Sequence, residues 1–136
     1  MTQPDFSQYA LALIHEGHIV FSSKNKGIAP LMECIEACSS RYRNCCLYDR
    51  VIGLAAAKLV VASRMITSVV AGVSSRPAVE FLQKSNIPME SQLMVPRIIA
   101  RDGISFCPME QRALTTDDAD LFLAQMRDFF RNLKEK

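Results

Sequence analysis

The chain has 136 residues, of which 49% are hydrophobic and 22% charged, and its 16 basic and 14 acidic side chains give a formal net charge of +2. This length suits one domain, residues 1–136, that closes a core without disulfide staples. The charges form no basic arm or stripe, so nucleic-acid binding is not expected.

The apolar runs are shorter than the roughly 18 residues needed to span a bilayer, and the amino terminus lacks the basic and apolar regions of a signal peptide. We therefore expect a cytoplasmic protein with no membrane partner. The five cysteines are an odd number, and in the cytoplasm such residues are usually reduced thiols.

The first part of the chain predicts a β-hairpin followed by a helix. Residues 9–15 and 18–22 are apolar runs separated by a Glu-Gly pair, which is the pattern of a tight turn. His15 and His18 flank this turn, and without a third ligand in view we interpret them as exposed turn residues. Apolar residues then recur at helical spacing from Ile28 to Cys38, which predicts an amphipathic helix.

The centre of the sequence predicts two successive strand–helix units. Residues 45–52 form a short apolar strand, and the alanine-rich helix from Gly53 to about Ser63 should be buried on nearly every side. Residues 66–73 and 77–84 repeat the pattern, with Pro at the first helical position. Two such units imply parallel strands joined by right-handed crossovers.

The last part of the chain predicts a strand, a loop and a long helix. Residues 90–99 fit a strand interrupted by a proline, which favours an edge position or the end of the strand. Residues 101–110 form a compact loop rich in polar and sulfur groups. A helix follows over about 116–134, and Thr115 with Asp118 resembles a capping box at its start.

One apolar stripe runs along this last helix. Its members are Phe122, Met126, Phe129, Phe130 and Leu133. Core packing is the simplest role for the stripe, yet two adjacent phenylalanines widen it beyond what one small sheet needs. Self-association through this helix is the second interpretation, and we expect a homo-oligomer, with a dimer favoured.

The order of these elements predicts an α/β fold, a three-layer α/β/α sandwich whose mixed sheet starts with a β-hairpin. Three segments, residues 49–57, 75–78 and 101–110, together resemble a small prokaryotic family known only as a domain of unknown function. The resemblance extends from about residue 11 to residue 110. It implies a cytidine-deaminase-like fold.

The sequence departs from the zinc deaminases at each metal ligand. Those enzymes place His or Cys, then Ala and Glu, at the helix start after the central strand, and Pro-Cys-x-x-Cys at the next helix start. Here residues 54–56 are Leu-Ala-Ala and residues 77–81 are Pro-Ala-Val-Glu-Phe. The resemblance therefore implies a relative without zinc or another cofactor, in which no metal-bound water can attack a base.

Polar side chains gather where the two central strands end and their helices begin. Free N–H groups at two helix starts, hydroxyls and an arginine favour a site for a nucleotide or another phosphate-bearing small molecule. The expected ligand-binding residues are Asp49, Arg50, Ser74, Ser75, Arg76, Arg101 and Asp102. The alternative is that the serines only cap a helix and the charges are solvated.

The cysteines offer a second kind of chemistry. Cys107 lies in a polar loop, where Arg101 could lower its pKa and make the thiol reactive, although no histidine lies nearby in sequence to act as its base. A structural thiol is the alternative. Cys34 and Cys38 are four residues apart on a helix and could share a metal, but core cysteines are the favoured interpretation.

Three hypotheses for function remain open at this point. The leading one is a zinc-free binding or regulatory protein that holds a small ligand, such as a nucleotide, at the helix N-termini. The second is a metal-independent enzyme in which Asp49 or Cys107 takes the nucleophilic or acid–base role. The third is an oligomeric scaffold without a ligand.

Overall fold

The computed structural model describes residues 6–25, 27–98 and 108–134. The strands are β1 (Leu11–His15), β2 (His18–Ser23), β3 (Cys45–Ile52), β4 (Ile66–Ser75) and β5 (Met89–Val95). The helices are α1 (Ala29–Cys38), α2 (Leu54–Ser63), α3 (Arg76–Lys84), α4 (Pro108–Leu114) and α5 (Ala119–Lys134). None of these described helices is long and apolar enough to cross a membrane.

The strands form one mixed sheet in the order β2-β1-β3-β4-β5. β1 pairs antiparallel with β2 and β3, whereas β3, β4 and β5 run parallel. Glu16 and Gly17 both have positive φ, 50° and 83°, as a tight turn between right-twisted strands requires. The predicted hairpin and the predicted parallel strands are both confirmed.

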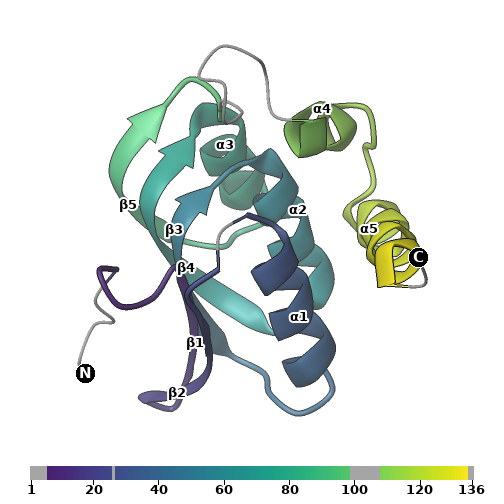
Figure 1. Ribbon diagram of the computed structural model, residues 1–136. Helices are drawn as coiled ribbons and strands as arrows, with labels where there is room; N and C mark the ends of the chain where they lie inside the picture. Colours follow the sequence, from purple (N-terminus) through teal and green to yellow (C-terminus); the bar gives the residue numbers. More distant parts are fainter. Residues whose placement is uncertain (1–5, 26, 99–107, 135–136) are drawn as a thin grey trace.

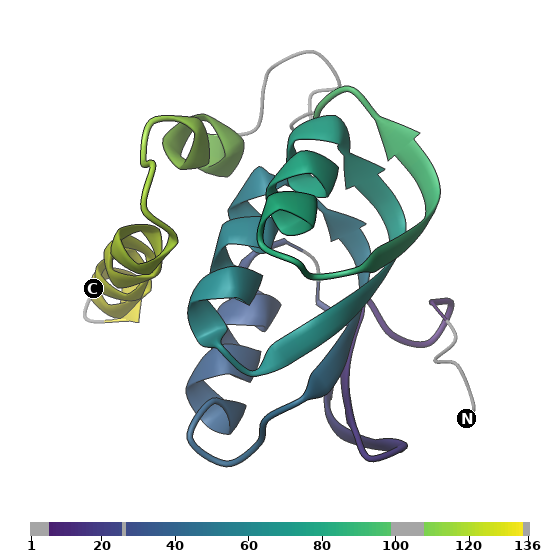
Figure 2. The same ribbon diagram turned by 180° about the vertical axis from the view of Figure 1, so that it is seen from behind.

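The helices α1, α2 and α3 lie side by side on one face of the sheet, and α4 and α5 pack on the outer side of α2 (Figures 1 and 2). This placement follows from the chain direction, because three successive right-handed crossovers that step the same way along a sheet put their helices on the same face. The predicted three-layer α/β fold with a mixed sheet is confirmed. The order of the layers, however, is sheet, inner helices, outer helices, so the described helices cover one face of the sheet, where the predicted α/β/α order has helices on both.

The helix α2 is the centre of the core. Nine of its ten residues are buried, since the sheet lies beneath it, α1 and α3 flank it and α4 and α5 cover it. The small side chains of Ala55, Ala56 and Ala57 allow the neighbouring elements to approach closely. The prediction that this helix is buried on nearly every side is therefore confirmed.

The other face of the sheet carries a smaller core cluster of Ala12, Ile14 and Tyr48. The segment before β1 packs against it, and the rings of Phe6 and Tyr48 lie 6.5 Å apart. The guanidinium of Arg50 holds this segment in place, because it donates hydrogen bonds to the carbonyls of Phe6 and Tyr9.

The structure differs from the sequence prediction in three places after α3. β5 ends at Val95, because Pro96 has no N–H to continue the ladder. A helix, α4, begins at Pro108 where the sequence predicts only a loop. The predicted capping box is wrong: the Asp120 N–H donates to Asp118 Oδ1 at 2.8 Å, whereas the Thr115 hydroxyl donates to a carbonyl of α4.

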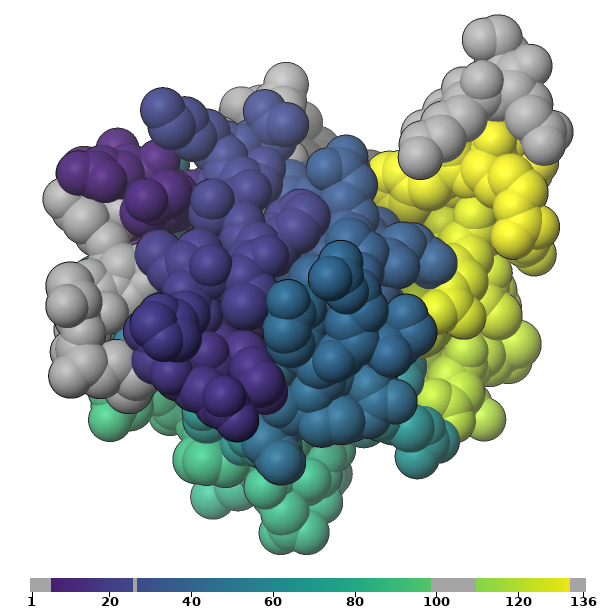
Figure 3. Space-filling view, turned by 90° about the horizontal axis from the view of Figure 1, so that it is seen from below, coloured from purple at the N-terminus to yellow at the C-terminus, as the bar shows by residue number. Residues whose placement is uncertain are grey.

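The apolar stripe of α5 serves the monomer's own core. Phe122 and Met126 are fully buried, and Phe130 packs against the core cluster from a partly buried position. Figure 3 shows α5, in yellow, packed along one side of the molecule. Core packing therefore accounts for these three residues of the stripe.

Candidate functional site

A cavity of about 290 Å³ lies where β3 ends and where α1 and α2 begin. Here the antiparallel hairpin on one side of β3 meets the parallel strands on the other. Ligands of open α/β sheets commonly bind outside the carboxyl ends of the parallel strands. The lining residues are Ala10, Leu11, Asn25, Gly27, Ile28, Pro30, Asp49, Arg50, Val51, Gly53, Ala56, Ile98 and Glu110.

Asp49 is the buried acidic group that β3 contributes to this cavity. It is 8% exposed and pairs across the sheet with Leu11 of β1 and Ala71 of β4. Burial raises the pKa of its carboxyl to about 8, against the opposing effects of the backbone N–H groups of Val51 and Arg50 and of the Arg50 charge. At neutral pH the carboxyl is therefore largely protonated, so it can donate a hydrogen bond as well as accept one.

Glu110 of α4 occupies the start of α2. The N–H groups of Leu54 and Ala55 donate to its two carboxylate oxygens at 2.8 and 2.9 Å, and the residue is 4% exposed. A negative charge at this end of a helix is favourable, and these N–H groups have no partner within the helix. The expectation of free N–H groups is therefore wrong for Leu54 and Ala55, because an internal carboxylate already binds them.

Burial raises the pKa of Glu110. The hydrogen bonds from Ala55 and Leu54 and the charge of Lys58 act in the opposite direction, since each of them favours the carboxylate. The pocket therefore contains two buried acids, of which one is engaged by the backbone of α2.

Gly53 leaves room for this carboxylate. A Cβ at this position would lie 2.2 Å from Glu110 Oε1 and 2.8 Å from Ile98 Cγ1. Gly53 is also the N-cap residue of α2 and provides no side-chain cap. Glu110 supplies the missing cap from a position 56 residues further along the chain.

Lys58 completes the attachment of α4 to α2. Its ammonium donates hydrogen bonds to the carbonyls of Ala113 and Thr116, at the carboxyl end of α4. The residue is 5% exposed, and burial lowers its pKa, while the charges of Asp117 and Glu110 oppose this shift. A carboxylate of α4 therefore caps α2, and an ammonium of α2 caps α4.

Of the other predicted site residues, Arg50 also lines the cavity. Its guanidinium, however, binds the carbonyls of Phe6 and Tyr9. Asp49 and Arg50 are thus brought to one cavity, with the carboxyl buried and the guanidinium used to hold the amino-terminal segment.

Ser74, Ser75 and Arg76 are not among the residues that line the cavity. The Ser75 hydroxyl accepts the N–H of Ala78 at 3.3 Å and caps α3, and the Ser74 hydroxyl donates to that of Ser91 at 2.7 Å. Arg76 is exposed. For Ser75 the helix-capping interpretation is therefore correct.

Arg101, Asp102 and Cys107 lie outside the described residues, so their predicted roles stay predictions. Cys34 and Cys38 are core residues, as the favoured interpretation has it. Burial raises the pKa of both thiols, which makes them poor nucleophiles. Among the described residues, no group of three or more His, Cys, Asp or Glu side chains is placed to hold a metal ion.

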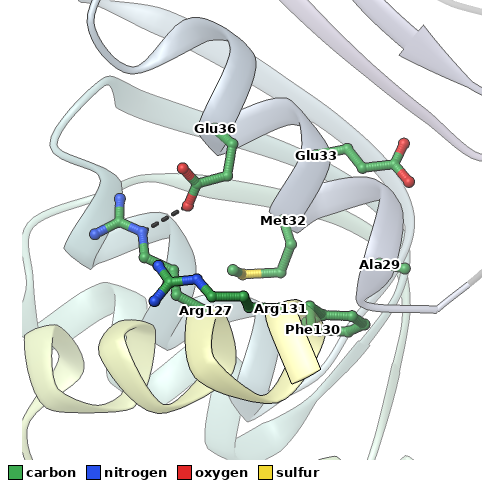
Figure 4. Close-up of a pocket in the computed structure, with 7 residues that line it drawn as sticks. All are labelled: Ala29, Met32, Glu33, Glu36, Arg127, Phe130 and Arg131. Carbon is green, nitrogen blue, oxygen red and sulfur yellow. Dashed lines mark hydrogen bonds and ion pairs between the residues drawn. The ribbon is translucent and has the colours of Figure 1, made fainter. Parts of the chain in front are cut away.

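A second cavity of about 270 Å³ lies between α1 and α5 (Figure 4). Met32 and Phe130 provide apolar surface, Glu36 lies on the α1 side, and Arg127 and Arg131 lie on the α5 side. Arg127 Nε donates to Glu36 Oε1 at 2.5 Å, and both side chains are about half exposed. This groove is bordered by solvated charges, whereas the first cavity contains buried ones.

Sequence reasoning missed Glu110 and Asn25 as site residues. The sequence holds one signal for Glu110: α2 begins after a glycine, with no Ser, Thr, Asp or Asn at its N-cap. A buried helix start without a cap must obtain a partner from elsewhere in the chain. We find no comparable signal for Asn25.

The fold and the cavity define a small mixed-sheet α/β protein with buried acidic groups near the carboxyl end of its central strand. A profile described as "TM1506: Domain of unknown function (DUF1893)" matches residues 5–130, and the chain belongs to this family. The predicted membership of a family of unknown function is thus confirmed. No curated protein matches the chain.

The fold is also that of a solved relative. The crystal structure of a DUF1893 family protein (TM1506) from Thermotoga maritima matches with a TM-score of 0.78 and 25% sequence identity. The match covers 90% of this chain and 81% of that one. The relation to cytidine deaminases stays a prediction.

Proposed function

We propose that the protein binds a small organic molecule in the cavity beside Asp49. The observation that carries the proposal is a buried carboxyl that borders a cavity of about 290 Å³ at the carboxyl end of the central strand. Ligand sites in proteins are commonly concave and mostly apolar, with a few placed polar groups. This cavity has that composition.

The chemistry of the lining favours a neutral or weakly basic ligand over an anion. Asp49 and Glu110 are both acidic, and the N–H groups of Leu54 and Ala55 at the start of α2 already donate to Glu110. A phosphate placed here would meet two carboxyl groups and could not use those two donors. If the ligand is a nucleotide, its base therefore occupies the cavity and its phosphate lies outside.

The size of the cavity limits the ligand further. Pockets for drug-sized ligands commonly enclose about 300–1,000 Å³, so this cavity lies at the lower limit. A single heterocycle with adjacent donor and acceptor atoms would fit the Asp49 carboxyl, which can donate and accept at neutral pH. The proposed ligand class is thus a small heterocycle, such as a nucleobase.

Titration of the purified chain with matched nucleobases, nucleosides and nucleotides tests this proposal. We expect free bases to bind more tightly than their phosphorylated forms. We expect Asp49→Ala to weaken binding about five- to thirtyfold, because one buried hydrogen bond is worth about 1–2 kcal/mol. Asp128→Asn, at an exposed position on α5, is the control and should bind as the wild type does. Tighter binding of the phosphorylated forms would contradict the proposal.

A second candidate function rests on the raised pKa of Asp49. A buried acid that titrates near neutral pH is suited to general acid–base catalysis. In that case a bound ligand would be converted to a product of different mass, and Asp49→Asn would abolish conversion while leaving binding measurable. Unchanged ligand after prolonged incubation with the wild type would count against an enzyme.

A further inference from the structure

A row of aliphatic side chains crosses three strands and reaches the edge of the sheet. Val51, Val73 and Leu93 are directly paired across β3, β4 and β5, and side chains of paired residues project from the same face. Val51 is 43% exposed and Leu93 is 56% exposed, and Met94, the next residue on β5, is 49% exposed. Both ends of this row are therefore exposed, and Leu93 is the end that lies on the outermost strand.

Leu93 lies on β5, an edge strand with few of the features that normally prevent an edge strand from pairing with another chain. No helix or strand of the described chain lies beside the outer edge of β5 (Figures 1 and 2). Between Met89 and Val95 it contains one charged residue, Glu90, and no proline, and its ladder with β4 has no register shift. Edge strands of this kind readily accept another strand.

The opposite edge is less suited to pairing. The ladder of β2 with β1 is irregular between Leu13 and Ile14, which increases the local twist. The one large aliphatic side chain on β2 that is strongly exposed is Ile19, and the strand ends in two serines. β5 is therefore the edge at which a second strand fits better.

We propose that β5 pairs antiparallel with β5 of a second copy of this chain, about a twofold axis that passes beside Leu93. In this register Leu93 of one protomer faces Leu93 of the other. The aliphatic rows of the two protomers therefore become continuous across the axis. A self-complementary patch of this kind is what a twofold interface requires.

The charges are compatible with this arrangement. Glu90 is three residues from the axis and would lie opposite Pro96 of the second copy, which follows the end of β5. The two Glu90 side chains are therefore not opposite each other. The formal net charge of +2 is small, so long-range repulsion between two copies is weak. The pairing needs neither the ligand of the cavity nor the α5 stripe.

Sedimentation velocity of the full chain over a range of concentrations tests the interface. We expect a dimer whose dissociation constant rises at least about tenfold with Leu93→Asp, because this change places two carboxylates face to face at the axis. Leu121→Asp is the matched control, since Leu121 is 53% exposed on α5. It should leave the dimer intact.

Three results would overturn the proposal. One is a wild-type chain that stays monomeric at every concentration, and another is a dimer that Leu93→Asp does not weaken. The third is a dimer that Leu121→Asp dissociates, since this would place the interface on α5. Circular dichroism of each variant verifies folding, which exposed substitutions should preserve.

Cysteine cross-linking tests the register. In a chain carrying Cys46→Ser and Cys107→Ser, Leu93→Cys should give a disulfide-linked dimer under mild oxidation, because residues that face each other across strands lie within bridging distance. Glu90→Cys is the control, because its two copies would lie about 20 Å apart. Cross-linking through position 90 and not 93 would overturn the register.

Discussion

At the scale of single residues, Asp49 and Gly53 decide the character of the site. Asp49 brings an acid into a mostly apolar cavity, and Gly53 leaves the space that the Glu110 carboxylate occupies. Each residue lies at a strand end or a helix start, where sequence reasoning places ligand sites in α/β proteins. Their effects on stability can be measured separately.

Asp49 makes stability depend on pH. Its pKa is raised from 3.8 to about 8, so the folded protein holds a proton that the unfolded chain has lost over that interval. Stability is therefore full below the unfolded value and falls as pH rises towards 8. We predict that Asp49→Asn stabilises the protein by about 3–4 kcal/mol more at pH 8 than at pH 5, because the proton that the folded state holds contributes about 1.4 kcal/mol per pH unit over that interval.

Urea unfolding of both proteins at the two pH values measures this difference. Asp128→Asn, at an exposed position on α5, is the control and should show no such dependence. An equal effect of Asp49→Asn on stability at pH 5 and pH 8 would show that the fold does not raise the pKa of the Asp49 carboxyl.

A methyl group at position 53 should conflict with Glu110. We predict that Gly53→Ala destabilises the protein by about 1–3 kcal/mol, because the new Cβ overlaps the carboxylate at 2.2 Å and the carboxylate must move away from α2. In a Glu110→Ala background the same change should cost much less. A double-mutant cycle on thermal unfolding measures the coupling, and additive effects would argue against the contact.

At the scale of elements, α2 and α4 hold each other by complementary charges at their ends. Glu110 caps the start of α2, and Lys58 binds the carbonyls at the end of α4. These groups are buried, so the loss of either partner leaves polar atoms unsatisfied.

We predict that Lys58→Met loosens α4 from α2. The substitution keeps an apolar stem of similar size but leaves the carbonyls of Ala113 and Thr116 without their donor, at a cost of about 1–3 kcal/mol. Hydrogen exchange should accelerate in α4 before it does in the sheet. Lys84→Met, at an exposed position at the end of α3, is the control, and equal exchange in the two variants would contradict the prediction.

The sequence predicts elements whose apolar pattern matches their burial. The β-hairpin and the two strand–helix units have clear periods and turn residues, so local pattern and tertiary structure agree. α4 was missed because Pro108 follows a polar stretch that resembles a loop. The start of α5 was misplaced because Thr115 and Asp118 both suit an N-cap, and local sequence does not choose between them.

Two polar residues of the candidate site, Asp49 and Arg50, could be predicted from the sequence. Both follow from their place near the end of β3. Glu110 reaches α2 from 56 residues away, and no local pattern carries that contact. The expected phosphate site depended on free N–H groups, and Glu110 binds those of Leu54 and Ala55 at the start of α2.

At the scale of the whole molecule, the described helices cover one face of the sheet and leave an edge strand open. The cavity lies at the carboxyl end of β3, and the aliphatic row runs from its wall, at Val51, to the β5 edge, at Leu93. The proposed ligand site and the proposed dimer interface therefore lie on neighbouring but separate parts of the sheet. A variant such as Leu93→Asp should thus change assembly without removing the cavity.

Localising a bound ligand by two-dimensional NMR tests the central claim most directly. With small heterocycles added to the labelled chain, we predict shifts for the amides of Leu11, Ile28 and Gly53, which line the cavity, and their loss in Asp49→Ala. Shifts confined to Met32 and Arg127 would place the ligand in the groove between α1 and α5. That result, or no shift with any heterocycle, would contradict a ligand site at Asp49.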